Sequence, residues 1–173
     1  MIIDGYALSL QKAVRAALLA DADLTSLIST RLYDEPPENV TFPYARFGSI
    51  EADTDDTDGS LGSVLSFTIE AYSRVTGRVE ASRIVEAVRA ALHRQEETLG
   101  SLMLADRVNT GYLLQENSSV ILLENGDQIV NTDIWTNPIE LICNDYFVER
   151  DDAVGRGYTG RALFTAMLET SKT

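Results

Sequence analysis

The sequence has few of the residues on which most enzymes and metal sites depend. It holds one histidine, His93, and one cysteine, Cys143, among 173 residues. A single thiol excludes an internal disulfide and a zinc site built from several cysteines. A Ser–His or Cys–His catalytic pair would have to use His93, which we expect instead at the end of a helix as a cap. Cys143 ends an apolar stretch, where a buried, unreactive thiol is the simpler interpretation.

Long apolar runs are also missing. No stretch approaches the roughly 20 residues that a membrane span needs. The N-terminus from Met1 to Gly5 lacks the basic stretch and apolar block of a signal peptide, so we expect a protein kept in a reducing cytoplasm. Hydrophobic residues make up 45% of the chain, which is enough for an ordinary core in one domain or one domain with an appendage.

Basic residues are scarce. Lysine occurs only at Lys12 and Lys172, the formal net charge is −13, and the pI is about 4.4. Such a surface repels phosphate, which argues against binding nucleic acid through charge neutralisation. The same repulsion would suit a pore through which DNA has to slide. The simpler alternative is an acidic protein whose charge serves solubility alone.

Periodicity predicts two main helices, over residues 8–20 and 79–93, because apolar residues recur on one helical face in each. Ser9 is the expected N-cap of the first, and Asp23 that of a short second helix. Alternating or β-rich segments predict strands, and Pro138 predicts an edge strand or a bulge. The predicted strands cover residues 31–33, 43–50, 63–72, 102–108, 120–123 and 134–143. This order predicts an α+β fold with two main helices packed on one face of a mostly antiparallel sheet.

The character of the chain changes after Cys143. Residues 144–160 are polar and rich in glycine, and residues 159–169 have the spacing of a short helix. We therefore expect one domain over residues 1–143. Residues 144–173 are expected to be a C-terminal extension that becomes ordered against a neighbouring subunit.

Two polar segments are candidate sites. Residues 51–62 predict a long exposed loop, with carboxylates at Glu51, Asp53, Asp55, Asp56 and Asp58. A calcium loop beginning at Asp53 would place Asp58 where glycine is required, so no metal site is expected. The glycines of residues 155–160 lack the strand and helix of a dinucleotide site, so no cofactor is expected either. The second segment is a predicted hairpin turn formed by Glu124, Asn125, Gly126 and Asp127.

The linear arrangement of these pieces resembles a known family. The resemblance rests on the helix of residues 10–18 followed by residues 20–24, on Arg31-Leu32-Tyr33-Asp34, on Pro36-Pro37, on Phe42-Pro43-Tyr44, and on Ala71-Tyr72-Ser73-Arg74 leading into the helix of residues 77–92. In order and spacing these segments resemble the tail-completion proteins of siphophages and prophages, which are related in fold to tail terminators. The resemblance covers residues 8–143, and the segments 112–133 and 144–173 depart from the family pattern.

The resemblance implies a structural protein of the bacteriophage virion, made in the host cytoplasm and placed at the neck, where the head and tail join. It implies a homo-oligomeric, usually hexameric ring that caps the tail tube, contacts the tube protein and the head connector, and lets DNA pass without specific binding. It implies no enzyme activity, no cofactor and no membrane. The carboxylates of Glu51 to Asp58 would then face the lumen or a partner, and the hairpin of Glu124 to Asp127 would grip the tube.

Two alternatives stay open at this point. A head-closure or stopper protein forms a ring at the same junction, and the sequence does not separate the two roles. A small-molecule-binding module or small enzyme, with the glycine-rich C-terminal segment as its ligand loop, is the alternative of a different class.

Overall fold

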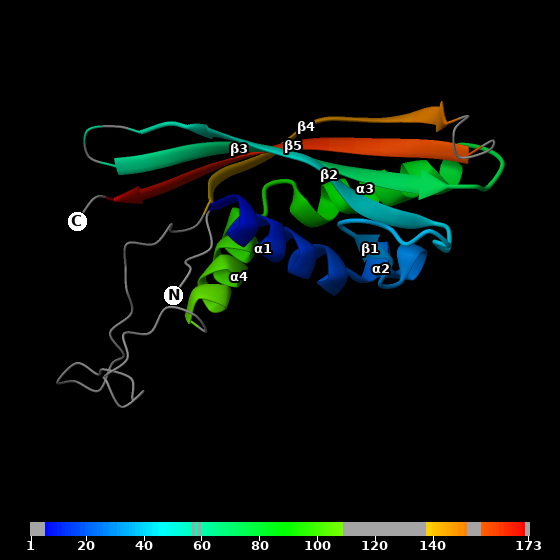
Figure 1. The fold of residues 1–173 in the computed structure, drawn as a ribbon, viewed down its shortest axis with the longest axis horizontal. Coiled ribbons are helices and arrows are strands. Elements are labelled where there is room, and N and C mark those ends of the chain that lie inside the picture. The colour runs from blue at the N-terminus through cyan, green and yellow to red at the C-terminus, as the bar shows by residue number, and fades with distance from the viewer. Residues whose placement is uncertain (1–5, 57, 59, 109–137, 152–156, 172–173) are drawn as a thin grey trace.

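The computed structural model describes residues 6–56, 58, 60–108, 138–151 and 157–171. Within these ranges the chain forms four helices and five strands (Figure 1). The predicted strand of residues 120–123 and the hairpin of residues 124–127 lie outside them. In chain order the elements are α1 (Tyr6–Ala20), α2 (Ala22–Ile28), β1 (Leu32–Tyr33), β2 (Tyr44–Thr54), β3 (Ser60–Ser73), α3 (Val79–Leu92), α4 (Glu96–Val108), β4 (Pro138–Asp151) and β5 (Gly157–Ser171).

The strands form one sheet in the order β1-β2-β3-β5-β4. The short β1 runs parallel to β2, and each other neighbouring pair is antiparallel. All four helices lie against one face of the sheet, and none of the described residues forms a helix on the opposite face (Figure 1). The predicted α+β fold with helices on one face of a mostly antiparallel sheet is therefore confirmed.

The core lies between the helix layer and the sheet. The apolar stripes of α1 and α3 are buried through Leu10, Val14 and Leu18, and through Ile84, Val85, Val88 and Leu92. From the sheet, alternate residues of β3 and β5 point toward them, and the rings of Phe67 and Phe164 stack with centroids 5.2 Å apart. The apolar faces of the helices and the inward-facing residues of the strands thus pack together in a single apolar layer.

The N-terminal helices begin at residues other than those predicted. Helix α1 begins at Tyr6, and Ser9 is a buried residue inside it, so the prediction of Ser9 as N-cap was wrong. Asp21, not Asp23, caps α2, because its carboxylate accepts a hydrogen bond of 2.7 Å from the backbone N–H of Leu24. Asp23 instead lies in the first turn of α2, where its negative charge interacts favourably with the helix dipole.

The segment 102–108 is helical, so its prediction as a strand was wrong. It belongs to α4, which starts with Glu96 and Glu97 in its first turn and continues through Gly100. Leu99 and Met103, four residues apart, are both buried and place one helical face against the core. That contact outweighs the roughly 1 kcal/mol that a glycine costs inside a helix.

The C-terminal segment is part of the sheet. The predicted boundary at residue 143 falls inside β4, and the predicted helix of residues 159–169 is the strand β5, which lies between β3 and β4. Leu163 and Met167 have helical spacing, but the buried residues alternate instead, at Ala162, Phe164, Ala166 and Leu168. A period of two fits a strand, and pairing on both sides of β5 satisfies its backbone.

The prediction for Pro138 is confirmed. Pro138 begins β4, which is the outer strand of the sheet, and the register shifts between Pro138 and Glu140. Proline has no backbone N–H to donate to a neighbouring strand. It is therefore tolerated at the first residue of an outer strand, where β4 has it.

Candidate functional site

The predicted acidic loop is largely a β-hairpin. Strand β2 continues to Thr54 and β3 starts at Ser60, so the prediction of a loop over residues 51–62 was wrong except at its tip. Glu51 and Asp53 lie on β2, whereas the other three carboxylates lie at the tip. All five predicted side chains are exposed, namely Glu51, Asp53, Asp55, Asp56 and Asp58. This end of the sheet, formed by β2, β3 and β5, extends beyond the helices in Figure 1.

A bulge in β2 decides which way these carboxylates point. Phe47 pairs with Ile69, but the next recorded pair is Ile50 with Phe67, so β2 holds one residue more than β3 over this stretch. The extra residue shifts the alternation by one, which places Ile50 on the helix side with Phe67. Glu51 consequently points to the helix-free face of the sheet. Without the bulge it would point toward the helices.

The hairpin tip is fixed by backbone contacts. The N–H of Asp55 donates to the carbonyl of Gly62 at 2.9 Å, and the N–H of Gly62 donates to the carboxylate of Asp56 at 3.0 Å. A Cβ on Gly62 would lie 2.1 Å from the carbonyl oxygen of Asp55, so this approach requires glycine. Asp56 therefore holds the tip together as well as contributing charge.

A row of alternating charges crosses the helix-free face. Glu70 on β3 lies between Arg46 on β2, at 2.7 Å, and Arg161 on β5, at 3.2 Å. Glu149 on β4 continues the row at 3.6 Å from Arg161. The side chain of Glu70 is 11% exposed, and those of the arginines are 38% and 41% exposed. Four strands are thus tied together on the face that the helices leave bare.

The acid–base properties of this row follow from its contacts. Burial of Glu70 would raise its pKa, but hydrogen bonds from Arg46 and Tyr72, and the positive charges of Arg46 and Arg161, together hold the pKa below its ordinary value. The Tyr72 hydroxyl donates to Glu70 at 2.8 Å. Burial first, and then this hydrogen bond and the charge of Glu70, raise the pKa of Tyr72 to about 12. Glu70 is therefore held ionised as a structural anion.

Carboxylates outnumber guanidinium groups on the helix-free face. Directly paired residues on neighbouring strands share a face. By register the face carries the carboxylates of Glu51, Asp53, Glu70, Glu140, Asp145, Glu149 and Asp151, against the guanidinium groups of Arg46 and Arg161. Arg94 of the α3–α4 turn also lies 3.0 Å from Glu140. The hairpin tip adds three more carboxylates at one end. The face is therefore a negatively charged surface with a neutralised, rigid band across it.

The other residues predicted as chemical candidates have structural contacts. His93 follows α3, where its backbone N–H caps the carbonyl of Arg89, and its Nδ1 accepts a hydrogen bond of 3.1 Å from the N–H of Cys143. Burial raises the pKa of the Cys143 thiol, which lowers the thiolate fraction at neutral pH. In the part of the chain that the structure describes, no three His, Cys, Asp or Glu side chains could jointly hold a metal ion. No helix among the described residues is long and apolar enough to cross a membrane.

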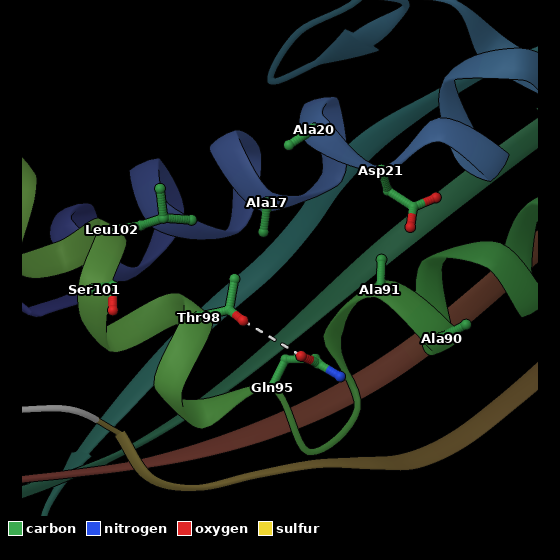
Figure 2. Close-up of a pocket in the computed structure, with 9 residues that line it drawn as sticks. All are labelled: Ala17, Ala20, Asp21, Ala90, Ala91, Gln95, Thr98, Ser101 and Leu102. Atoms are coloured by element: carbon green, nitrogen blue, oxygen red, sulfur yellow. Dashed lines mark hydrogen bonds between the residues drawn. The ribbon is translucent and has the colours of Figure 1, made fainter.

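A groove of about 480 Å³ lies on the helix side, between α1, the end of α3 and α4 (Figure 2). Its walls are mostly small residues, among them Ala17, Ala20, Ala90 and Ala91. Gln95, one of its polar lining residues, accepts a hydrogen bond of 3.3 Å from the hydroxyl of Thr98 (Figure 2). Among the described residues that line it, Asp21 is the one with a charged side chain, and its carboxylate caps α2. The groove thus shows packing between helices and no grouping of reactive side chains.

The structure brings some predicted site residues together and leaves others undescribed. The five hairpin carboxylates share one end of the sheet, whereas Glu124 to Asp127 lie outside the described residues. Sequence reasoning missed the row through Glu70 and Arg161, because the second arginine lies in a segment predicted as helix. A strand prediction over residues 157–171 would have put Arg161 on a strand, and the pairing of β5 with β3 then places it opposite Glu70.

Comparisons with known proteins agree with the architecture. The model of a family described as "Tail completion protein gp17" matches residues 12–115 of the chain. A solved chain from the structure "Virion of native gene transfer agent (GTA) particle" is 20% identical, with a TM-score of 0.66. That match covers 96% of this chain and 100% of the solved one, so the fold is shared over nearly the full length. No curated protein gives a significant match.

Proposed function

The chain belongs to the family of tail completion protein gp17, and from this premise we propose that it is a structural protein of a phage virion. In this proposal copies of the chain form a ring, expected to be a hexamer, at the junction of head and tail. The ring caps the finished tail tube, docks to the head connector, and lets DNA pass through its centre. The chain catalyses no reaction in this role.

The observation that carries the proposal is the one-sided sheet. Helices cover one face. The other face carries no described helix and has more carboxylates than guanidinium groups, with those of Glu51 and Asp53 turned onto it by the bulge in β2. In a ring, a bare acidic face suits the lumen, because its charge repels the phosphates of passing DNA and prevents adhesion. The shared fold with a chain of a gene transfer agent virion supports a place in a particle.

Rigidity of this face also supports the proposal. The ion pairs from Arg46 through Glu70 to Arg161 and Glu149 tie β2, β3, β5 and β4 together across the bare surface. At the same end of these strands, Tyr44 and Tyr72 stack with ring centroids 4.9 Å apart. A lumen wall that must keep its width while DNA slides past benefits from such cross-strand ties.

Tail length tests the role directly. In phage that lack the chain, loss of a terminator gives overlong tails, whereas loss of a stopper gives heads that leak DNA with tails of normal length. The proposal predicts overlong tails, corrected when the wild-type chain is supplied. Tails of normal length with leaking heads would show that the chain closes the head instead. Intact, infectious particles would contradict both roles.

Charge reversal tests the lumen. The double variant Glu51→Lys, Asp53→Lys leaves the core untouched, because both side chains are exposed. We expect normal tail length and slowed DNA ejection, since lysines attract the phosphates that the carboxylates repel. Glu38→Lys, at an exposed position outside the sheet, is the matched control and should eject normally. Ejection at the wild-type rate in the double variant would contradict the proposal that this face lines the lumen, but not the proposal that the chain forms a ring.

A further inference from the structure

Strand β4 is an outer strand of the sheet, and no described strand lies beyond it. Such an edge presents backbone N–H and C=O groups that can pair with another strand, so proteins usually cover or disrupt it. In this chain the first half of the β4 edge, up to Cys143, is hydrogen bonded to the turn between α3 and α4. We call this the closed half, and we call residues 145–151 the open half.

The α3–α4 turn closes the first half. The N–H of Arg94 donates to the carbonyl of Leu141 at 3.0 Å, and the N–H of Leu141 donates to the carboxylate of Glu96 at 3.0 Å. The N–H of Cys143 donates to Nδ1 of His93 at 3.1 Å. These three hydrogen bonds satisfy outer backbone groups of Leu141 and Cys143 as a neighbouring strand would. A register shift between Cys143 and Asp145 marks the end of this closed half.

The second half carries exposed aromatic rings. Tyr146 is 46% exposed and Phe147 is 38% exposed, and as consecutive strand residues they flank the edge on opposite faces. An edge protected only against aggregation is usually charged and lacks large apolar groups. Two adjacent exposed aromatic residues instead favour a contact surface.

A pocket opens beside this second half. It has a volume of about 240 Å³ and lies between α3 and β4. Arg78, Ser82, Val85 and Glu86 line one side, and Tyr146, Phe147 and Val148 line the other. When a strand adds to a sheet edge, its backbone supplies hydrogen bonds and alternate side chains enter neighbouring pockets. The pocket has the place and the size to receive one such side chain.

Charge decides what kind of strand fits. Residues 145–151 of β4 carry three carboxylates, on Asp145, Glu149 and Asp151, and one guanidinium group, on Arg150. Arg161 lies 3.6 Å from Glu149, and Arg89 lies over the ring of Tyr146, so Asp145 is the carboxylate taken as the contact for a basic residue. The part of β2 beyond its pairing with β1 is the other uncovered edge of the described sheet, and it carries Glu51 and Asp53. Like charges directly opposite one another weaken strand pairing, so a second copy of this chain is a poor occupant.

Register gives a second reason against a second copy. Tyr44 of β2 is level with Tyr72, Thr159 and Glu149 across the sheet. The uncovered part of β2 therefore lies toward the opposite end of the sheet from the open half of β4. Side-by-side copies would not bring these two stretches level without a large shift along the strands.

We infer that the open half of β4, residues 145–151, is a docking site for an extended strand of a different protein. That strand carries an apolar side chain for the pocket, flanked by lysine or arginine residues. It pairs with the β4 backbone, covers the rings of Tyr146 and Phe147, and places a basic group near Asp145. This site is separate from the acidic hairpin and does not depend on a ring.

The experiment uses the isotope-labelled full chain and a blocked peptide, Lys-Val-Lys-Val-Thr-Val-Lys, followed by NMR. Amide shifts should concentrate in residues 145–150 and along α3 beside the pocket. The variants Tyr146→Ser and Phe147→Ser should each weaken binding about tenfold, as loss of a central aromatic contact does. Leu8→Ser, which removes a similarly exposed apolar residue from α1, is the matched control and should bind normally.

Three outcomes would overturn the inference. One is the absence of shifts in residues 145–150 with the peptide. Another is equal binding of a peptide with glutamate in place of lysine. The third is a change of the same amides with protein concentration alone, which would make a second copy the occupant. Asp145→Lys, at an exposed position, gives an independent check that leaves the aromatic residues in place, because it should weaken binding of the basic peptide.

Discussion

Replacing Glu70 with glutamine removes the negative charge on which Arg46, Arg161 and Tyr72 converge. The side chain is 11% exposed and lies 2.7 and 3.2 Å from the two guanidinium groups. Breaking a buried ion pair costs about 3–5 kcal/mol. The two arginines stay partly hydrated and glutamine keeps an acceptor for Tyr72, so we expect a loss nearer 2–3 kcal/mol.

Urea and thermal unfolding measure this loss. For a domain of this size, the expected loss lowers the Tm by roughly 5–10 °C. The pKa of Glu70 is lowered by folding, so its contribution is present above the ordinary carboxyl value of 4.5 and disappears as the pH falls through the lowered value. The stability difference between Glu70→Gln and the wild type should therefore shrink as the pH is lowered below 4.5.

Glu149→Gln is the matched control. Its side chain is 51% exposed and 3.6 Å from Arg161, so it belongs to the same row without being buried. Exposed pairs contribute at most about 1 kcal/mol, and we expect a loss below that. Equal losses for the two variants, or a difference between Glu70→Gln and the wild type that does not change with pH, would refute the role given to Glu70.

Three further predictions concern single residues. Gly62→Ala should cost about 1–3 kcal/mol and speed amide exchange at Asp55, because the added methyl group meets the carbonyl oxygen of Asp55; unchanged exchange there would contradict the tip geometry. His93→Ala should cost about 1 kcal/mol and expose the amide of Cys143 to exchange, since it removes the acceptor at 3.1 Å; unaltered protection of that amide would argue against the closed half of β4. In an ultraviolet pH titration one tyrosine should ionise near pH 12, and Tyr72→Phe should remove that step, with the stability that Tyr72 contributes lost as the pH rises from 10 toward 12; a titration that Tyr72→Phe leaves unchanged would contradict the contact with Glu70.

The elements predicted best from the sequence are those with one dominant period. Residues 79–93 predicted α3, which spans Val79–Leu92, and residues 63–72 predicted the centre of β3, which spans Ser60–Ser73. In both segments local spacing and burial agree. These two core elements could therefore be predicted without tertiary information.

The errors occur where two periods fit the same residues. In β5 the helical spacing of Leu163 and Met167 competed with alternation at Ala162, Phe164 and Ala166, and pairing with β3 and β4 decided in favour of the strand. In residues 102–108 the strand pattern gave way to the burial of Leu99 and Met103 on one helical face. Both decisions depend on partners distant in sequence, which no local pattern contains.

The candidate site was predicted in part. Composition alone identified the carboxylates of residues 51–58, but their direction depends on a register shift between Phe47 and Ile50 that is visible only against β3. The ion pairs of Glu70 were missed for a similar reason, since Arg161 is 91 positions away along the chain, from 161 − 70. Charge content can be read from the sequence, whereas the face that carries it depends on pairing.

The most direct test of the central claim is electron cryomicroscopy of the particle or tail that contains this chain. We expect a ring of the chain at the head-proximal end of the tail tube. In that ring the helix-free face, with Glu51 and Asp53, should line the channel and α1, α3 and α4 should lie outside. A ring with the helices toward the channel, or particles that lack the chain, would contradict the claim.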